Sequence, residues 1–125
     1  MTTPRSDGKM RLGAFLMPTG HHVASWRHPD ADADAGINFG HYVRLAQTAE
    51  RAKFDMVFLQ DNLAVREADP EALRRSAQYI ANFEPLTLIG GLAAMTQRIG
   101  LVATASTTYY EPFHVARKFA SLDHI

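Results

Sequence analysis

The chain has 125 residues, and 46% of them are apolar. This length and composition suit one packed globular domain and exclude a wholly disordered chain. Thirteen Lys and Arg residues offset thirteen Asp and Glu residues, so no net positive field would attract nucleic acid or anionic lipid. Cysteine is absent, which excludes disulfides, thiolate metal sites and a cysteine nucleophile.

Residues 1–10 are polar and lack the apolar segment of a secretory signal. They predict a flexible leader and a cytoplasmic protein. The most apolar stretch, residues 86–95, is much shorter than the roughly 20 apolar residues that span a bilayer. No membrane segment is therefore expected.

Three short apolar runs predict buried strands, at residues 12–17 (LGAFLM), 56–59 (MVFL) and 99–103 (IGLVA). Each run is continuous and does not alternate with polar residues. This pattern is typical of parallel strands that are covered on both faces.

Helical spacing follows each run. Residues 39–53 carry apolar side chains at three- and four-residue steps. Residues 85–97 and a third segment, which runs from Pro112 through Leu122, each begin with proline, which is favoured at the first helical position. Residues 121–125 still read as helix. Gly90 and Gly91 weaken the second helix unless close packing against a strand compensates.

The resulting order, β-α-β-α-β-α, predicts the first three units of a (β/α) barrel over residues 11–125. The loops at 18–37 and 62–84 are longer than a minimal unit requires. Three strands cannot close a barrel. We therefore expect the chain to be the N-terminal part of a longer single-domain enzyme.

Candidate site residues follow the strands, because ligands of such folds bind beyond the carboxyl ends of the strands. His21 and His22 follow the first strand, Asp61 the second, and Thr104 and Ser106 the third. Adjacent histidines in an extended segment point in opposite directions, so at most one faces a ligand. Asp61 either binds a ligand or caps a loop, and the two hydroxyls either reach the barrel mouth or satisfy strand-end backbone.

This rim of hydroxyls and amides suits the donors and acceptors of a flavin pyrimidine ring or a sugar-like chain. The sequence contains neither a Walker A motif nor a dinucleotide-binding G-x-G-x-x-G motif. A nucleoside triphosphatase and a Rossmann dehydrogenase are correspondingly disfavoured.

Several blocks occur in the order found in a known family. They are residues 25–29 (SWRHP), 52–61 (AKFDMVFLQD), 103–108 (ATASTT), 111–117 (EPFHVAR) and 121–124 (SLDH). With these blocks the chain resembles the nitrilotriacetate, dibenzothiophene-sulfone and pristinamycin synthase monooxygenases of the bacterial-luciferase-like superfamily.

The resemblance implies a (β/α)8 TIM barrel and a two-component monooxygenase. Such an enzyme takes reduced FMN from a separate NAD(P)H-dependent flavin reductase and inserts one oxygen atom of O2 into a small organic substrate. Relatives of this kind are usually homo-oligomers.

The resemblance also implies roles for single residues. Asp61 matches the strand-two flavin contact and Thr104 the strand-three contact, with Ser106 beside it. His21 matches a rim histidine that is a candidate catalytic residue. The Ala105–Ser106 bond matches a cis peptide of related barrels.

The chain departs from the family at Gln60, where alanine is common. Two other functions stay open. One is a metal-dependent hydrolase on the same barrel, which would use His21 or His22 with Asp61. The other is a truncated, non-catalytic flavin-binding protein.

Overall fold

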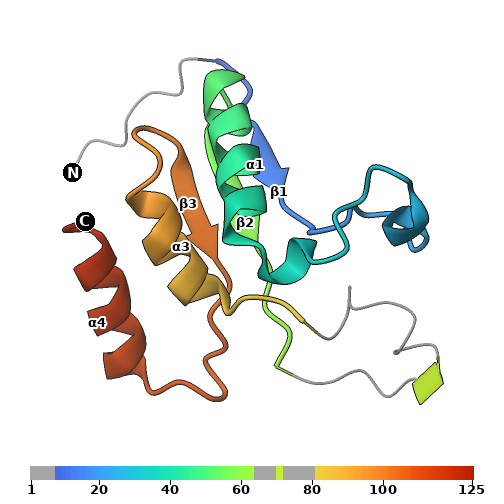
Figure 1. The fold of residues 1–125 in the computed structure, drawn as a ribbon. Helices are drawn as coiled ribbons and strands as arrows, with labels where there is room; N and C mark the ends of the chain where they lie inside the picture. Colours follow the sequence, from blue (N-terminus) through green and yellow to red (C-terminus); the bar gives the residue numbers. More distant parts are fainter. Residues whose placement is uncertain (1–7, 64–69, 72–80) are drawn as a thin grey trace.

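The computed structural model describes residues 8–63, 70–71 and 81–125. Three strands, β1 (Gly13–Phe15), β2 (Met56–Leu59) and β3 (Gly100–Ala103), form a parallel sheet in the order β1-β2-β3 (Figure 1). In this register Met56 lies between Gly13 and Gly100, and Phe58 lies between Phe15 and Val102. The three predicted strands and their parallel pairing are confirmed.

The helices α1 (Phe39–Arg51), α3 (Pro85–Ala93) and α4 (Pro112–Leu122) follow β1, β2 and β3 in turn. Helix α1 begins after Asn38, whose side-chain oxygen accepts the backbone N–H of His41 in the first turn. Helix α3 begins at its proline and ends at Ala93, four residues before the predicted end. The chain turns there because the N–H of Met95 and the hydroxyl of Thr96 both donate to a carbonyl of the last helical turn.

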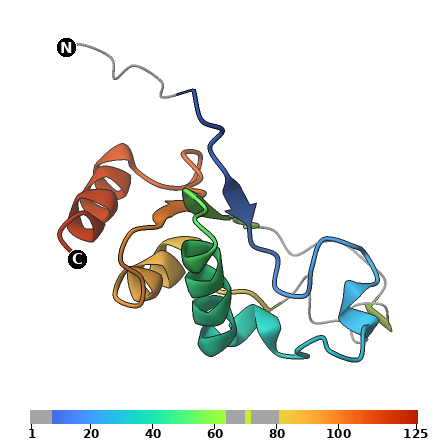
Figure 2. The ribbon, with the colours of Figure 1, turned by 90° about the horizontal axis from the view of Figure 1, so that it is seen from above.

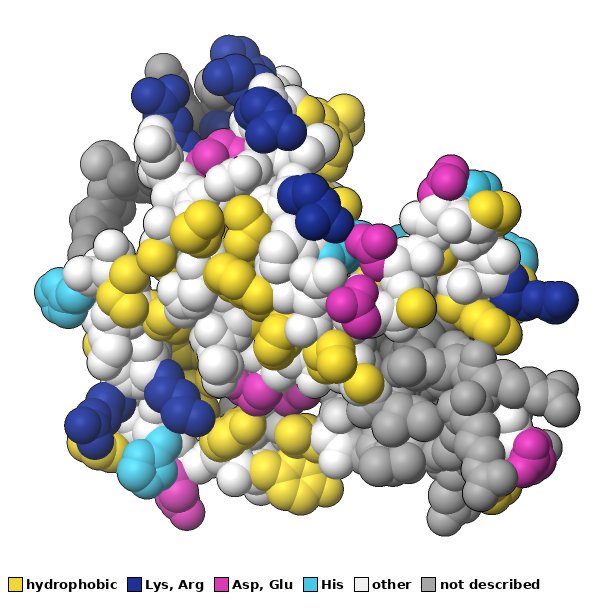
Figure 3. Space-filling model, viewed as in Figure 1, with side chains coloured by type: hydrophobic (Ala, Val, Ile, Leu, Met, Phe, Trp, Pro, Cys, Tyr) yellow, Lys and Arg dark blue, Asp and Glu magenta, His cyan; other side chains and the backbone are white. Residues whose placement is uncertain are grey.

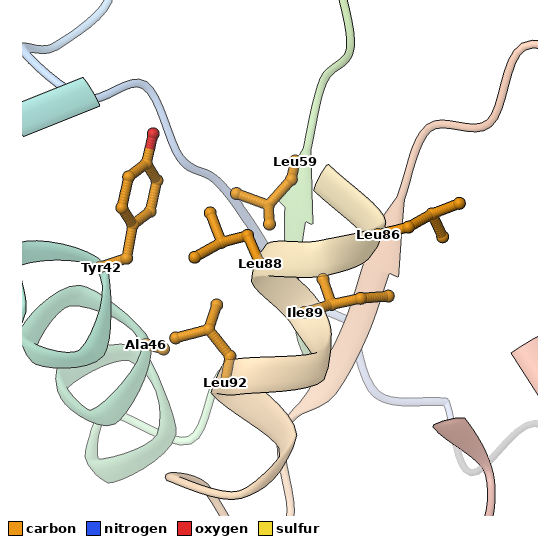
Figure 4. Close-up of a cluster of buried hydrophobic side chains, with 7 residues drawn as sticks. All are labelled: Tyr42, Ala46, Leu59, Leu86, Leu88, Ile89 and Leu92. Carbon is orange, nitrogen blue, oxygen red and sulfur yellow. The ribbon is translucent and has the colours of Figure 1, made fainter. Parts of the chain in front are cut away.

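The hydrophobic core lies between one face of the sheet and helices α1 and α3. Figure 4 shows a cluster of buried side chains that interlock across this layer. Its members are Tyr42, Ala46, Leu59, Leu86, Leu88, Ile89 and Leu92. The two helices approach closely because Gly91 faces the ring of Phe39, where a Cβ atom would lie 2.8 Å from Cε2. The close packing at Gly91 is thus against helix α1, whereas the sequence predicted close packing against a strand.

The opposite face of the sheet is open. Helices α1 and α3 both lie on one side of it (Figure 2), and Phe15, Met56 and Val102 on the other side remain 41%, 40% and 38% exposed. The prediction that both faces are covered is therefore wrong for this chain. The helices cover the outer face of the sheet. The inner face of a barrel is covered only when further strands close the barrel.

Two predicted segments lie partly outside the described residues, namely positions 1–7 of the leader and positions 64–69 and 72–80 of the 62–84 loop. The 18–37 loop carries two short 3-10 turns, Ser25–Arg27 and Ala35–Ile37. Within the part of the chain that the structure describes, no helix is long and apolar enough to cross a membrane.

Candidate functional site

The carboxyl ends of β1, β2 and β3 meet at one end of the molecule, as parallel pairing requires. His21 folds back onto β1, where its Nε2 atom lies 2.9 Å from the carbonyl oxygen of Phe15. A carbonyl only accepts, so Nε2 carries a proton and donates, and in the neutral imidazole this tautomer leaves the lone pair on Nδ1. The imidazole edge also packs on the Phe15 ring, at 4.9 Å between centroids.

His22 is held in a different way from its neighbour. Its Nδ1 atom accepts the backbone N–H of Ala24 at 3.1 Å. Across residues 8–63, 70–71 and 81–125, no three His, Asp or Glu side chains are grouped so that they could hold a metal ion. The donor arrangement therefore gives the metal-dependent hydrolase no support.

Asp61 lies two residues beyond β2 and is half-buried. Its Oδ2 atom is buried and has no hydrogen-bond partner in the structure. The loop-capping alternative requires backbone N–H groups on this carboxylate, and none is seen on Oδ2. A buried acceptor without a donor is costly, so this atom indicates a place where a ligand can supply one.

Asp61 lines a cavity of about 350 Å³ between the ends of β1 and β2 and the beginnings of α1 and α3. Much of the wall consists of leucine, proline, methionine and phenylalanine side chains. No Lys, Arg or His occurs among the described residues that line it. The polar lining consists of Tyr42, Gln60, Asp61, Asn62, Asn82 and Glu84.

Glu84 has a structural task in this wall. Its carboxylate accepts the backbone N–H groups of Leu86 and Thr87 and the Thr87 hydroxyl, at 2.7 to 3.0 Å, and so caps α3. Burial alone would raise the pKa of Glu84, but these hydrogen bonds and the positive charge of Lys118 outweigh it and hold the pKa below its usual value. Glu84 is therefore an occupied carboxylate, in contrast to Asp61.

Tyr42 also lines the cavity, although its helical spacing alone predicts only a member of the apolar face of α1. Its side chain comes from α1 and is 4% exposed, yet no protein group of the structure hydrogen-bonds its hydroxyl. Burial raises the pKa of Tyr42 to about 12. The polar tip of an otherwise apolar residue is the one sequence signal that could have pointed to it.

Thr104 and Ser106 do not line this cavity. The Thr104 hydroxyl donates to the Leu59 carbonyl at 3.2 Å, and its backbone N–H donates to the same oxygen at 3.0 Å. Thr104 thus satisfies strand-end backbone, while its hydroxyl oxygen can still accept a hydrogen bond. The carbonyl of Ser106 accepts the N–H of Tyr110 at 3.1 Å.

The expectation of a cis bond at Ala105–Ser106 is wrong, because the structure describes both residues and contains no cis peptide there. A non-proline peptide strongly prefers the trans form unless its surroundings impose the cis form.

The opposite end of the sheet uses its carboxylates for structure. One Glu50 oxygen accepts three successive backbone N–H groups, of Gln97, Arg98 and Ile99, at 2.9, 2.6 and 3.1 Å. These hydrogen bonds hold the pKa of Glu50 below its usual value. Lys and Arg side chains also gather at this end of the molecule, the upper end in Figure 3. In (β/α) barrels, residues at the amino ends of the strands usually stabilise the fold, whereas ligands bind at the carboxyl ends.

The order of the elements, the parallel sheet and the polar strand ends agree with what comparison with known proteins finds. The family model described as luciferase-like monooxygenase matches residues 16–125. The chain belongs to this family. The resemblance inferred from the sequence is thereby confirmed.

Two relatives within the luciferase-like family are informative. The N-acetyl-S-(2-succino)cysteine monooxygenase of Bacillus subtilis is 56% identical over 118 residues, which cover 94% of this chain and 25% of the relative. The nitrilotriacetate monooxygenase component A of Aminobacter aminovorans is 42% identical, over 96% of this chain and 28% of the relative. The chain therefore spans about a quarter of the length of these relatives.

Solved structures give the same result. A riboflavin lyase crystal structure superposes with a TM-score of 0.80 at 32% identity, covering 92% of this chain and 27% of its own. A long-chain alkane monooxygenase gives 0.77 at 32% identity, covering 94% and 28%. The chain is an α/β segment that corresponds to part of a luciferase-like barrel.

Proposed function

We propose that residues 11–125 form the N-terminal three βα units of a single barrel domain in a two-component monooxygenase. The full-length enzyme would use reduced FMN and O2 to oxygenate a small organic substrate. Two features support this. Relatives that share nearly the whole chain are named monooxygenases, and one face of the sheet is left open in the way that an unclosed barrel leaves its interior.

The observation that carries the proposal is the unpaired Oδ2 atom of Asp61. It is buried, it lines a cavity at the carboxyl ends of the strands, and it can only accept a hydrogen bond while ionised. The ring system of reduced FMN presents N–H donors. The residues present therefore fit the flavin.

When bound, reduced flavin supplies the reaction with O2 through which one oxygen atom reaches the substrate. The protein has to position the ring and keep water away from it. Asp61 would hold a ring N–H. The Thr104 hydroxyl, fixed by its bond to the Leu59 carbonyl, would accept from the ring edge with Ser106 beside it, and His21 would accept a proton at Nδ1.

The proposal includes the partners that the resemblance implies. These are a separate NAD(P)H-dependent flavin reductase and further copies of the same chain in a homo-oligomer. It also includes the cytoplasmic location expected from the sequence.

The test uses the full-length protein with a flavin reductase, NADH, FMN, 18O2 and N-acetyl-S-(2-succino)cysteine, the compound in the name of the Bacillus subtilis relative. We expect one 18O atom in each product molecule, and no product without the reductase. Asp61→Leu, which has similar volume and no acceptor, should weaken FMN binding more than Asp61→Asn. Product that carries oxygen only from water would contradict the proposed function.

A further inference from the structure

We propose that Tyr42 and Asp61 form one recognition pair in the cavity, which binds the edge of an amide or imide. The ligand N–H would donate to Asp61, and the neighbouring ligand carbonyl would accept from the Tyr42 hydroxyl. This inference rests on the proposed function and extends it, because it adds Tyr42, a residue of the outer helix layer, to the site. The ligand edge belongs either to the flavin pyrimidine ring or to an amide of the substrate.

The first argument is the position of the Tyr42 hydroxyl. The ring is anchored in the core beside Ala46 and packs edge-on against Phe83, at 6.0 Å between centroids. Figure 4 shows the hydroxyl directed away from Ala46 and Leu92. Tyr42 as a whole is 4% exposed, and none of the described residues hydrogen-bonds its hydroxyl, which is not fully buried and can face the cavity that Tyr42 lines.

The second argument is the complementarity of the two groups. A tyrosine phenol is protonated at neutral pH, and burial raises the pKa of Tyr42 further, so its hydroxyl can donate. The Asp61 oxygen is an acceptor without a donor. One donor and one acceptor that line the same cavity match the adjacent carbonyl and N–H of an amide or imide.

The third argument is the charge of the cavity. Its described lining contains two carboxylates, Asp61 and Glu84, and no Lys, Arg or His. Among these described lining residues a ligand carboxylate or phosphate would meet no cation, and the two carboxylates would repel it. The cavity, at about 350 Å³, has room for a small planar group against its apolar wall. It therefore suits a neutral group with both donor and acceptor.

The test compares Tyr42→Phe with the wild type in the full-length enzyme. Phenylalanine keeps the ring and removes only a hydroxyl that has no protein partner. We therefore expect the Tm of the ligand-free protein to stay the same or rise. Ligand binding should weaken about threefold to tenfold, the range for loss of one neutral hydrogen bond. Tyr110→Phe, whose ring contacts Lys118 and does not line the cavity, is the matched control.

Two probes separate the sources of the ligand edge. If the flavin supplies it, Tyr42→Phe raises the Kd of FMN and leaves the KM of N-acetyl-S-(2-succino)cysteine unchanged. FMN methylated at N3 should then bind the wild type weakly. The Asp61→Asn substitution should also reduce the affinity for this methylated FMN less than it reduces the affinity for FMN. If the substrate supplies the edge, KM rises and the Kd of FMN does not change. In either case the double variant Tyr42→Phe/Asp61→Asn should show non-additive effects.

Two results would overturn the inference. One is a Tyr42→Phe enzyme whose FMN Kd and substrate KM both equal those of the wild type. The other is a fall in the Tm of ligand-free Tyr42→Phe, because the hydroxyl would then have a protein partner. Both differ from failure of the proposed function, in which the wild type itself would transfer no oxygen from O2.

Discussion

Gly36→Ala should disrupt the contact between the two long loops that frame the cavity. The added Cβ would lie 1.9 Å from the carbonyl oxygen of Ala81, whereas a carbon–oxygen contact needs about 3.3 Å. One loop must therefore move by roughly 1.4 Å, which separates the Gly36 carbonyl from the N–H of Phe83 that it accepts at 3.1 Å. Overpacking costs about 1–3 kcal/mol and the lost hydrogen bond about 1 kcal/mol, so the contact should weaken by about 2–4 kcal/mol.

Hydrogen exchange by mass spectrometry on the full-length protein measures this locally. The peptide that contains Phe83 should exchange at least about 30-fold faster, which corresponds to about 2 kcal/mol. Gly40→Ala is the control, because its Cβ would meet its nearest atom at an ordinary 3.4 Å and alanine favours helix α1. Unchanged exchange in Gly36→Ala would refute the reasoning. So would an equal acceleration in both variants.

Three further predictions concern the stability of the scaffold. Gly91→Ala should lower Tm, because the added Cβ would lie 2.8 Å from the Phe39 ring, and this clash should outweigh the helix preference of alanine, about 1 kcal/mol. The control Gly90→Ala should keep or raise Tm, because its Cβ would meet its nearest atom at 3.4 Å. If both variants gain stability, the close packing of α3 is not restrictive. Glu50→Gln should flatten the acid limb of the stability curve. The pKa of Glu50 is lowered in the fold, so its stabilisation is present above the unfolded pKa and is lost as pH falls through the folded pKa. Wild-type Tm should therefore fall more steeply than the variant's as the pH drops below the ordinary pKa of a glutamate. Parallel curves would contradict this. Lys53→Gly should raise the free energy of unfolding, measured in urea, by about 0.5 kcal/mol, because Lys53 has a φ of 65°, where glycine is unstrained. A loss of stability would show that the lysine side chain matters more than the backbone.

Much of the local structure could be predicted because it depends on neighbours in the sequence. The run at residues 56–59 became β2 with the same bounds. The helix predicted from Pro112 became α4, but it ends at Leu122 although residues 121–125 also read as helix. The second helix was predicted too long, because the bonds that close its last turn, from Met95 and Thr96, are not visible as a pattern.

The candidate site was predictable in part. Asp61 could be chosen because a carboxylate directly after a buried strand is unusual. Tyr42 could not, because its spacing marks it as core and only the fold shows that its hydroxyl faces a cavity without a partner. Thr104 and His21 do have backbone partners, a distinction that no residue type reveals.

The sequence by itself determined the order of strands and helices, the family, and which end of the sheet carries the polar side chains. Apolar periodicity, proline positions and motif blocks are local, so they can be recognised in the chain alone. The tertiary structure decided which polar atoms lack partners and which face of the sheet stays open. Those properties depend on contacts between segments far apart in sequence, such as Tyr42 with Phe83 and Gly36 with Ala81.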